Sequence, residues 1–155
     1  GSWLFLGAIF TTLDLPADAP EIDRCGTCRN CLDICPTAAF PAPYTLAPRR
    51  CISYLTIEQR ADPAPELAAR FDGWAFGCDA CNSVCPWNVK FAESTTVEDF
   101  ADRRDPDRGD AALFEQMDEA EFRRRYADTP LARPGLERMR RNVRLAVASR
   151  WTETQ

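Results

Sequence analysis

The chain contains eight cysteines and no histidine, and this combination restricts its chemistry more than any other feature. Without histidine there can be no Ser-His-Asp triad, no Cys-His pair, no zinc site with imidazole ligands and no imidazole-ligated haem. Most hydrolase mechanisms are therefore excluded, and any reactive chemistry must use sulfur. The cysteines are Cys25, Cys28, Cys31, Cys35, Cys51, Cys78, Cys81 and Cys85.

Seven of these cysteines form two closely spaced runs. The first run has the spacing C-x2-C-x2-C-x3-C over residues 25–35, and the second has the spacing C-x2-C-x3-C over residues 78–85. A proline follows each run directly, and Cys51 lies between them. Three kinds of site could use such a pattern: disulfide bonds, structural zinc and iron–sulfur clusters.

The spacing favours iron–sulfur clusters over the two alternatives. Disulfides form in oxidising compartments, and no feature of the sequence indicates export. Zinc can be bound by paired C-x2-C motifs, but it leaves no role for a third cysteine three residues later. The first run has the spacing that binds clusters in bacterial ferredoxins, where its fourth cysteine binds the other of two clusters.

This crossing rule assigns every cysteine to one of two [4Fe-4S] clusters. The first cluster takes Cys25, Cys28, Cys31 and Cys85, and the second takes Cys35, Cys51, Cys78 and Cys81. A long insertion, residues 52–77, separates two ligands of the second cluster. It contains an apolar run at 52–57 and a helix-like run at 65–71, and it indicates a cluster module embedded in a larger protein.

The C-terminal third is predicted to be helical. Asp118 and Glu121 have the spacing of a capping box, so a helix should begin near Glu119 and end before Pro130. A second helix should begin near Leu136. Its apolar face would consist of Leu136, Met139, Val143 and Val147, with Arg138, Arg140, Arg141 and Arg144 lying off that face.

Arginine is concentrated in this helical region. The chain has a formal net charge of −5, yet residues 121–150 contain nine arginines and only three acidic residues. Such a concentration can form a solvated helix surface, or it can bind an anionic polymer such as RNA.

The apolar run from Trp3 to Phe10 is predicted to form a buried strand. It is far shorter than the roughly 20 residues that a membrane-spanning helix needs. The predicted fold class is α+β. It combines this strand, a bacterial ferredoxin-like domain with two [4Fe-4S] clusters, and the C-terminal helices.

Several stretches in the same order resemble the iron–sulfur and C-terminal part of the tRNA epoxyqueuosine reductase family. They are C-G-T-C at 25–28 continuing to C-P-T at 35–37, A-P-R-R-C-I-S-Y-L-T-I-E at 47–58, F-G-C-D-A-C at 76–81 continuing to C-P-W-N at 85–88, and E-F-R-R-R at 121–125. Together they extend over nearly the whole chain.

The resemblance implies an oxidoreductase that uses cobalamin and two [4Fe-4S] clusters to reduce epoxyqueuosine to queuosine in the tRNA anticodon loop. This chain would be a fragment that relays electrons through the clusters. The acid that protonates the epoxide oxygen would lie in an absent N-terminal domain, so we expect no catalytic residue here. The protein would be cytoplasmic and monomeric, with tRNA and an external electron donor as partners and no membrane association.

The resemblance also implies a domain division and further site residues. Residues 1–15 would end a cobalamin-binding domain, 16–95 would form the two-cluster domain, and 96–155 would begin a region of HEAT-like helical repeats. Ser53, Asp79 and Ala80 would face cobalamin. Arg124 and Arg141 would contact tRNA.

Two other functions fit the cysteine pattern. One is a stand-alone ferredoxin-like electron-transfer module without catalysis of its own. The other is a corrinoid reductive dehalogenase, which shares the combination of cobalamin and two clusters but usually carries export signals and lacks an arginine-rich helical tail.

Overall fold

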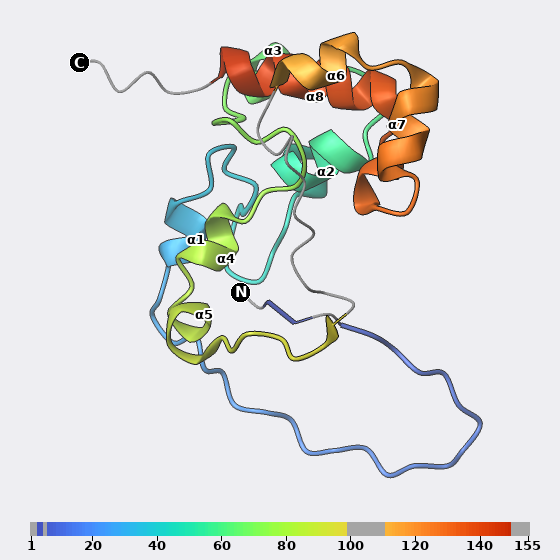
Figure 1. Cartoon of the computed structure of the whole chain (residues 1–155). Coiled ribbons are helices and arrows are strands. Elements are labelled where there is room, and N and C mark those ends of the chain that lie inside the picture. Colours follow the sequence, from blue (N-terminus) through green and yellow to red (C-terminus); the bar gives the residue numbers. More distant parts are fainter. Residues whose placement is uncertain (1–2, 5, 99–110, 150–155) are drawn as a thin grey trace.

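A computed structural model describes residues 3–4, 6–98 and 111–149, which form a set of short helices joined by long irregular segments (Figure 1). Five helices belong to the first two thirds: α1 (Asn30–Asp33), α2 (Ile52–Ile57), α3 (Pro65–Ala68), α4 (Ala80–Ser83) and α5 (Pro86–Phe91). Three more follow: α6 (Ala111–Gln116), α7 (Glu119–Tyr126) and α8 (Leu136–Ala148). Single 3-10 turns occur at Pro48–Arg50 and Pro130–Ala132.

The strand expected at residues 3–10 is not present, and this part of the prediction is wrong. The described residues of that run are exposed and irregular, and Phe10 keeps 98% of its surface accessible. A strand needs a neighbouring strand to satisfy its backbone groups, and no described segment pairs with this one. Across the described ranges the only pairing of strand type is an isolated bridge between Ala42 and Thr45, so the α+β class is not confirmed.

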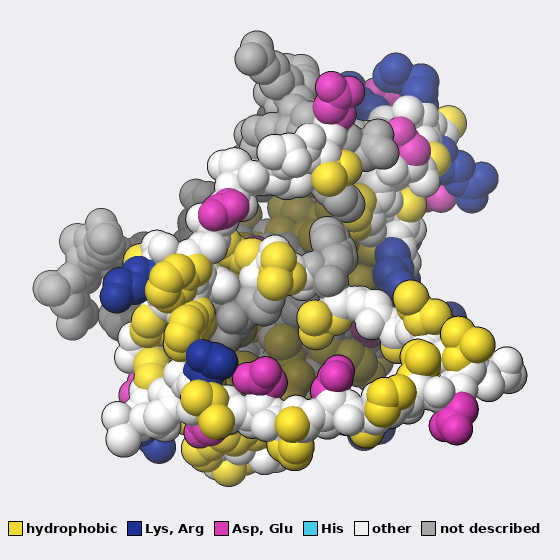
Figure 2. All heavy atoms as spheres, turned by 90° about the horizontal axis from the view of Figure 1, so that it is seen from below, with side chains coloured by type: hydrophobic (Ala, Val, Ile, Leu, Met, Phe, Trp, Pro, Cys, Tyr) yellow, Lys and Arg dark blue, Asp and Glu magenta, His cyan; other side chains and the backbone are white. Residues whose placement is uncertain are grey.

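The segment before α1 exposes an unusual amount of apolar surface. Leu6 and Ile9 are 91% and 95% exposed, and several further apolar side chains up to Ile22 are also open to solvent. Figure 2 shows hydrophobic side chains spread widely over the face seen from below. Within the described ranges, every helix is too short or too polar to cross a bilayer.

The two cysteine runs form a structural repeat. Each run has one cysteine within a four-residue helix, Cys31 in α1 and Cys81 in α4, and the two helices lie side by side. The residues that precede these helices, Arg29 and Asp79, have similar backbone angles, with φ of −123° and −111° and ψ of 4° and 11°. The repeated spacing therefore produces a repeated local conformation.

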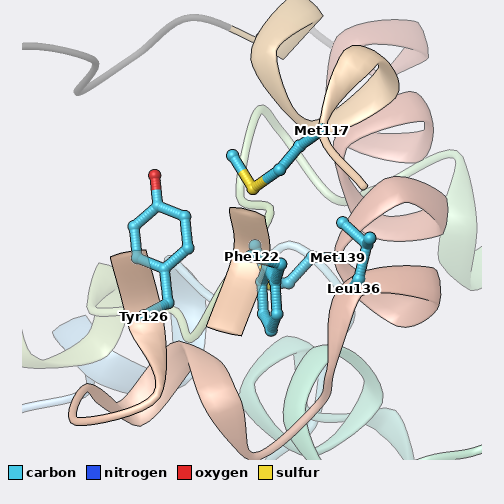
Figure 3. Packing of buried hydrophobic residues seen from close by; sticks show 5 residues of the cluster. All are labelled: Met117, Phe122, Tyr126, Leu136 and Met139. Carbon is cyan, nitrogen blue, oxygen red and sulfur yellow. The ribbon is translucent and has the colours of Figure 1, made fainter. Parts of the chain in front are cut away.

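The C-terminal helices share a hydrophobic core, drawn in Figure 3. Its buried members are Met117, Phe122, Tyr126, Leu136 and Met139. On α8 the predicted apolar face is correct except at Val147, which is 56% exposed, whereas Ala146 is buried. The buried apolar residues Leu136, Met139, Val143 and Ala146 are spaced by three, four and three residues. This spacing keeps them on one face of the helix, which includes position 146 and not 147.

Helix α7 begins where the sequence predicts. Asp118 is its N-cap, and a side-chain oxygen of Asp118 accepts a hydrogen bond of 2.8 Å from the Glu121 backbone N–H. Because the first backbone N–H groups of a helix have no partner within it, such a cap satisfies one of them. The Glu121 carboxylate binds Arg124 and Arg125 one turn later.

Replacing Asp118 by alanine should lower the free energy of unfolding by about 1 kcal/mol, the typical cost of losing an N-cap. The side-chain oxygen of an asparagine can still accept the hydrogen bond, so Asp118→Asn is the matched control and should stay close to the parent protein. Denaturant unfolding of the full-length protein measures both. Equal stability of the alanine and asparagine variants would contradict this role of the cap.

Candidate metal centre

Four cysteines from both runs line one cavity. This cavity, of about 320 Å³, is bounded by Cys25, Cys28, Cys31 and Cys85, together with Trp87, Lys90 and Phe91 among other residues. The first two thiols are exposed, Cys31 is half-buried and Cys85 is buried. These are the four residues that the crossing rule assigns to the first cluster, and the cavity brings them together although 54 positions separate the third from the last.

Hydrogen bonds fix the loop that carries the exposed thiols. The Asp23 carboxylate accepts hydrogen bonds from the Tyr44 hydroxyl (2.7 Å) and the Cys25 backbone N–H (2.8 Å), and these bonds lower the pKa of Asp23. The Cys28 N–H donates to the Cys25 carbonyl (3.1 Å), which closes a turn. Gly26 in that turn has a φ of +55°, a backbone conformation that residues other than glycine rarely adopt.

Two further hydrogen bonds join the first run to the second. The Asn30 side chain donates to the Val84 carbonyl (3.4 Å), just before the last cysteine of the second run. The Trp87 indole N–H donates to the Arg24 carbonyl (3.2 Å), just before the first cysteine of the first run. These two bonds therefore hold the segment around Cys25 next to the segment around Cys85.

The other four cysteines also lie near one another. Burial raises the pKa of the Cys78 thiol to about 11, and repulsion from Cys51, Cys81 and Cys35 adds to the rise. Burial likewise raises the pKa of Cys81, with Cys51 and Cys35 again contributing. Because thiolates crowded in a half-buried place repel each other, this set would be stabilised by a cation that binds them.

Backbone hydrogen bonds hold Cys35 and Cys51 of this second set. The Ala39 N–H donates to the Cys35 sulfur at 3.2 Å. Cys51 is the N-cap of α2, and its carbonyl accepts from the Leu55 N–H (2.9 Å). Cys85 of the first set caps α5 in the same way, with nearly the same φ, −68° against −72°. Hydrogen bonds to cluster sulfurs are among the factors that set the reduction potential.

The donor set fits iron–sulfur clusters. A [4Fe-4S] cluster is held by four cysteine thiolates, and the chain brings its eight cysteines into two groups of four. No group of three or more possible ligands among the described residues has the geometry for a single metal ion. A four-iron cluster distributes its thiolates over separate irons, so its ligands need not converge on one point.

The three residues expected to face cobalamin lie beside the second set. Asp79 and Ala80 lie between Cys78 and Cys81, as the N-cap and the first residue of α4. The Asp79 carboxylate accepts from the Asn82 side chain (3.2 Å). Ser53 is half-buried on α2, one residue after the helix begins. Asp79 is exposed and Ala80 is half-buried. Their role toward cobalamin stays a prediction.

The two arginines expected to contact tRNA differ in their surroundings. The Arg124 side chain is 71% exposed on α7 and pairs with Glu121. The Arg141 side chain is only 14% exposed, because its guanidinium donates to backbone carbonyls that include Leu55 (2.9 Å) and Ala61 (2.8 Å). Both assignments stay predictions, but Arg124 is better placed to meet a ligand.

Other arginines of α8 also bind the protein itself. Arg138 donates to the Ile57 carbonyl (3.2 Å), Arg140 to the Phe114 carbonyl (2.9 Å), and Arg144 pairs with Glu115 at 2.6 Å. Much of the positive charge in the sequence therefore serves contacts between helices. Charge composition alone could not distinguish these arginines from exposed ones.

Comparisons with known proteins agree with the cysteine chemistry. Residues 24–88 match the family described as a 4Fe-4S double cluster binding domain. The chain is 45% identical to the epoxyqueuosine reductase of Xanthomonas campestris over 149 residues, which is 96% of this chain and 42% of that protein. It is 37% identical to the Escherichia coli epoxyqueuosine reductase over 155 residues, 99% of this chain and 41% of that one. The resemblance to epoxyqueuosine reductases is confirmed.

Solved structures give the same result. A crystal structure of epoxyqueuosine reductase with an epoxyqueuosine-modified tRNA-Tyr stem loop superposes with a TM-score of 0.75 at 30% identity, over 86% of this chain and 35% of that one. An epoxyqueuosine reductase from Bacillus subtilis gives a TM-score of 0.73 at 30% identity, over 87% and 36%. The chain spans less than half the length of the Xanthomonas and Escherichia relatives, and it is homologous to part of such an enzyme.

Two buried polar residues beside the second set of cysteines were not found from the sequence. Thr56 and Asn142 are fully buried. The Asn142 side chain donates to the Thr56 carbonyl, and the Thr56 hydroxyl accepts from the backbone N–H of Gly77, just before Cys78. Asn142 interrupts the apolar face of α8, and an amide at such a position indicates a buried hydrogen-bond partner. That signal was available, but the partner could be identified only in three dimensions.

Paired cysteine replacements test the two ligand sets. Cys31→Ala with Cys85→Ala removes two ligands of one predicted cluster and should leave about four irons per chain, since the other [4Fe-4S] cluster keeps its ligands. Cys35→Ala with Cys85→Ala removes one ligand from each cluster and should lose iron from both. Iron and acid-labile sulfide counts after anaerobic reconstitution measure the difference. Equal iron content in the two double variants would contradict the crossing.

Proposed function

We propose that this chain is the cluster-binding and C-terminal part of an epoxyqueuosine reductase, an oxidoreductase that converts epoxyqueuosine to queuosine in tRNA. The observation that carries the proposal is 45% identity to a named epoxyqueuosine reductase over 96% of the chain. The grouping of the eight cysteines into two sets supports the same conclusion. A stand-alone electron carrier would not require this extended similarity through the C-terminal helices.

The proposal gives each cysteine set a cluster. Cys25, Cys28, Cys31 and Cys85 would hold the first, and Cys35, Cys51, Cys78 and Cys81 the second. When bound, the clusters would supply one-electron transfer and cobalamin the reduction of the epoxide carbon. Ser53, Asp79 and Ala80 would lie on the cobalamin side of the second cluster. The repeat of α1 and α4 supports a pseudo-twofold, ferredoxin-like arrangement of ligands.

The chain's own residues would hold and shield these groups. Hydrogen bonds between the two runs keep Cys25 and Cys85 together, and the Ala39 N–H supports the Cys35 sulfur. No residue of the chain is assigned as the acid that protonates the epoxide oxygen. An external donor would supply electrons, and the whole enzyme would act as a cytoplasmic monomer.

The domain division predicted from the sequence belongs to the same proposal. The exposed apolar side chains between Leu4 and Leu15 would be covered by a cobalamin-binding domain to which residues 1–15 belong. Large exposed apolar surfaces usually bind a partner. Residues 16–95 would form the two-cluster domain. Helices within 96–155 would begin a region of HEAT-like repeats that contacts tRNA.

The function is tested by nucleoside analysis of epoxyqueuosine-containing tRNA after reaction with the full-length enzyme, cobalamin and a reductant. We expect queuosine to form and epoxyqueuosine to disappear. A variant with Cys51→Ala, which should lack the second cluster, is the control and should leave the epoxide intact. Persistence of epoxyqueuosine with the enzyme fully loaded would refute the proposal and favour a stand-alone electron carrier.

Replacing Arg124 by glutamate should weaken the binding of the full-length enzyme to tRNA and reduce the slope of log affinity against log salt by about 1, the expected effect of losing one phosphate contact. Arg60→Glu makes the same charge change at an exposed position outside the C-terminal helices and is the matched control. Filter binding at several salt concentrations measures both variants. An unchanged slope for Arg124→Glu would contradict a phosphate contact there.

A further inference from the structure

Side chains of α8 donate hydrogen bonds to the backbone carbonyls at the C-terminal end of α2. The last carbonyls of a helix have no partner within it, and α2 is only six residues long. Arg141 donates to the Leu55 and Ala61 carbonyls, and Arg138 donates to the Ile57 carbonyl. A helix this short is unstable alone, and α8 is one of the elements that stabilise it.

Asn142 lies at the centre of this contact and is fully buried. Its side-chain N–H donates to the Thr56 carbonyl at 2.7 Å. Its side-chain oxygen accepts from the Arg141 guanidinium at 2.9 Å and 3.1 Å. Since a carbonyl can only accept and a guanidinium can only donate, the orientation of the Asn142 amide is determined by its neighbours.

Thr56 extends the contact to the second cysteine run. Its hydroxyl, also fully buried, donates to the Ile52 carbonyl at 2.8 Å and accepts from the Gly77 backbone N–H at 3.1 Å. Gly77 has a φ of +67° and directly precedes Cys78. Ile52 directly follows Cys51, at the start of α2. One threonine hydroxyl is therefore bonded to the neighbours of two cysteines.

Hydrophobic packing joins the same elements. Ile52, Leu55 and Phe71 form a buried cluster. Leu145 of α8 and Cys78 both pack against this cluster. The loop before Cys78, the start of α2 and the middle of α8 are thus held by both polar and apolar contacts.

We propose that Asn142 and Thr56 are positioning residues for the second cluster, and that they hold Cys51 and Cys78 at the separation the cluster requires. This inference rests on the proposed ligand sets. It gives α8 a role beyond packing or tRNA binding, because the helix that supplies Asn142 also fixes the surroundings of two cluster ligands. The groups that bind a metal's ligands commonly tune its properties in this way.

Three variants of the full-length protein test the role. Thr56→Val keeps the shape of the side chain but removes the hydroxyl that bonds Gly77. Asn142→Leu keeps similar bulk but removes the amide. Thr56→Ser keeps the hydroxyl and should restore the parent behaviour. Met139→Ala, on the same helix but in the other hydrophobic core, is the control for general loss of stability.

The readout is a redox titration of the reconstituted clusters followed by electron paramagnetic resonance. The signal of the second cluster is identified as the one that disappears in Cys51→Ala. In Thr56→Val and Asn142→Leu, we expect this signal to change shape and its midpoint potential to shift, with faster loss of its iron to a chelator. The first cluster should keep its signal, and Met139→Ala and Thr56→Ser should leave both clusters as in the parent.

The outcomes separate this inference from the proposed function. If both Thr56→Val and Asn142→Leu leave the second signal unchanged, or change it only as Met139→Ala does, the positioning role is wrong. If the parent protein binds no second cluster, or Cys51→Ala loses no signal, the proposed ligand set itself is wrong. Failure of one variant to fold leaves the other to decide the positioning role.

Discussion

Bringing four thiols to one place is the constraint on which the first two thirds of this structure depend. The cysteines lie in loops, at helix N-caps and in helices of four residues. Helices of that length do not persist alone. Few apolar side chains are buried around them, and Ile52, Leu55 and Phe71 are the main exceptions. Because metal binding is coupled to folding, clusters that bind these thiols would also stabilise the loops that carry them.

The C-terminal helices pack directly against the part of the chain that carries the cysteines, here called the body. Helix α8 carries Leu145 into the core around α2, while α6 and α7 share the second core with Phe76, two residues before Cys78. Arg138 and Arg141 of α8 donate hydrogen bonds of 2.8 to 3.4 Å to backbone carbonyls of the body. The packing of these helices is therefore continuous with the segments that carry Cys51 and Cys78.

The sequence predicted correctly those features that depend on interactions between residues close together in the chain. The cap at Asp118 and the start of α8 at Leu136 depend on neighbours within a few residues, and both were predicted correctly. The strand at 3–10 failed because apolar composition does not supply a pairing partner. The surroundings of Arg141 could not be predicted, since its carbonyl partners lie about eighty positions earlier in the chain. The cysteine spacing indicated which thiols gather, but not the Thr56 and Asn142 contacts beside them.

The central claim is that this chain binds two four-iron clusters through all eight of its cysteines. A count of iron, acid-labile sulfide and zinc per chain in the anaerobically reconstituted full-length protein, combined with Mössbauer spectroscopy, tests it most directly. The account predicts about eight iron and eight sulfide with the spectrum of [4Fe-4S] clusters and no zinc. Zinc without sulfide, or about four iron in the parent protein, would contradict it.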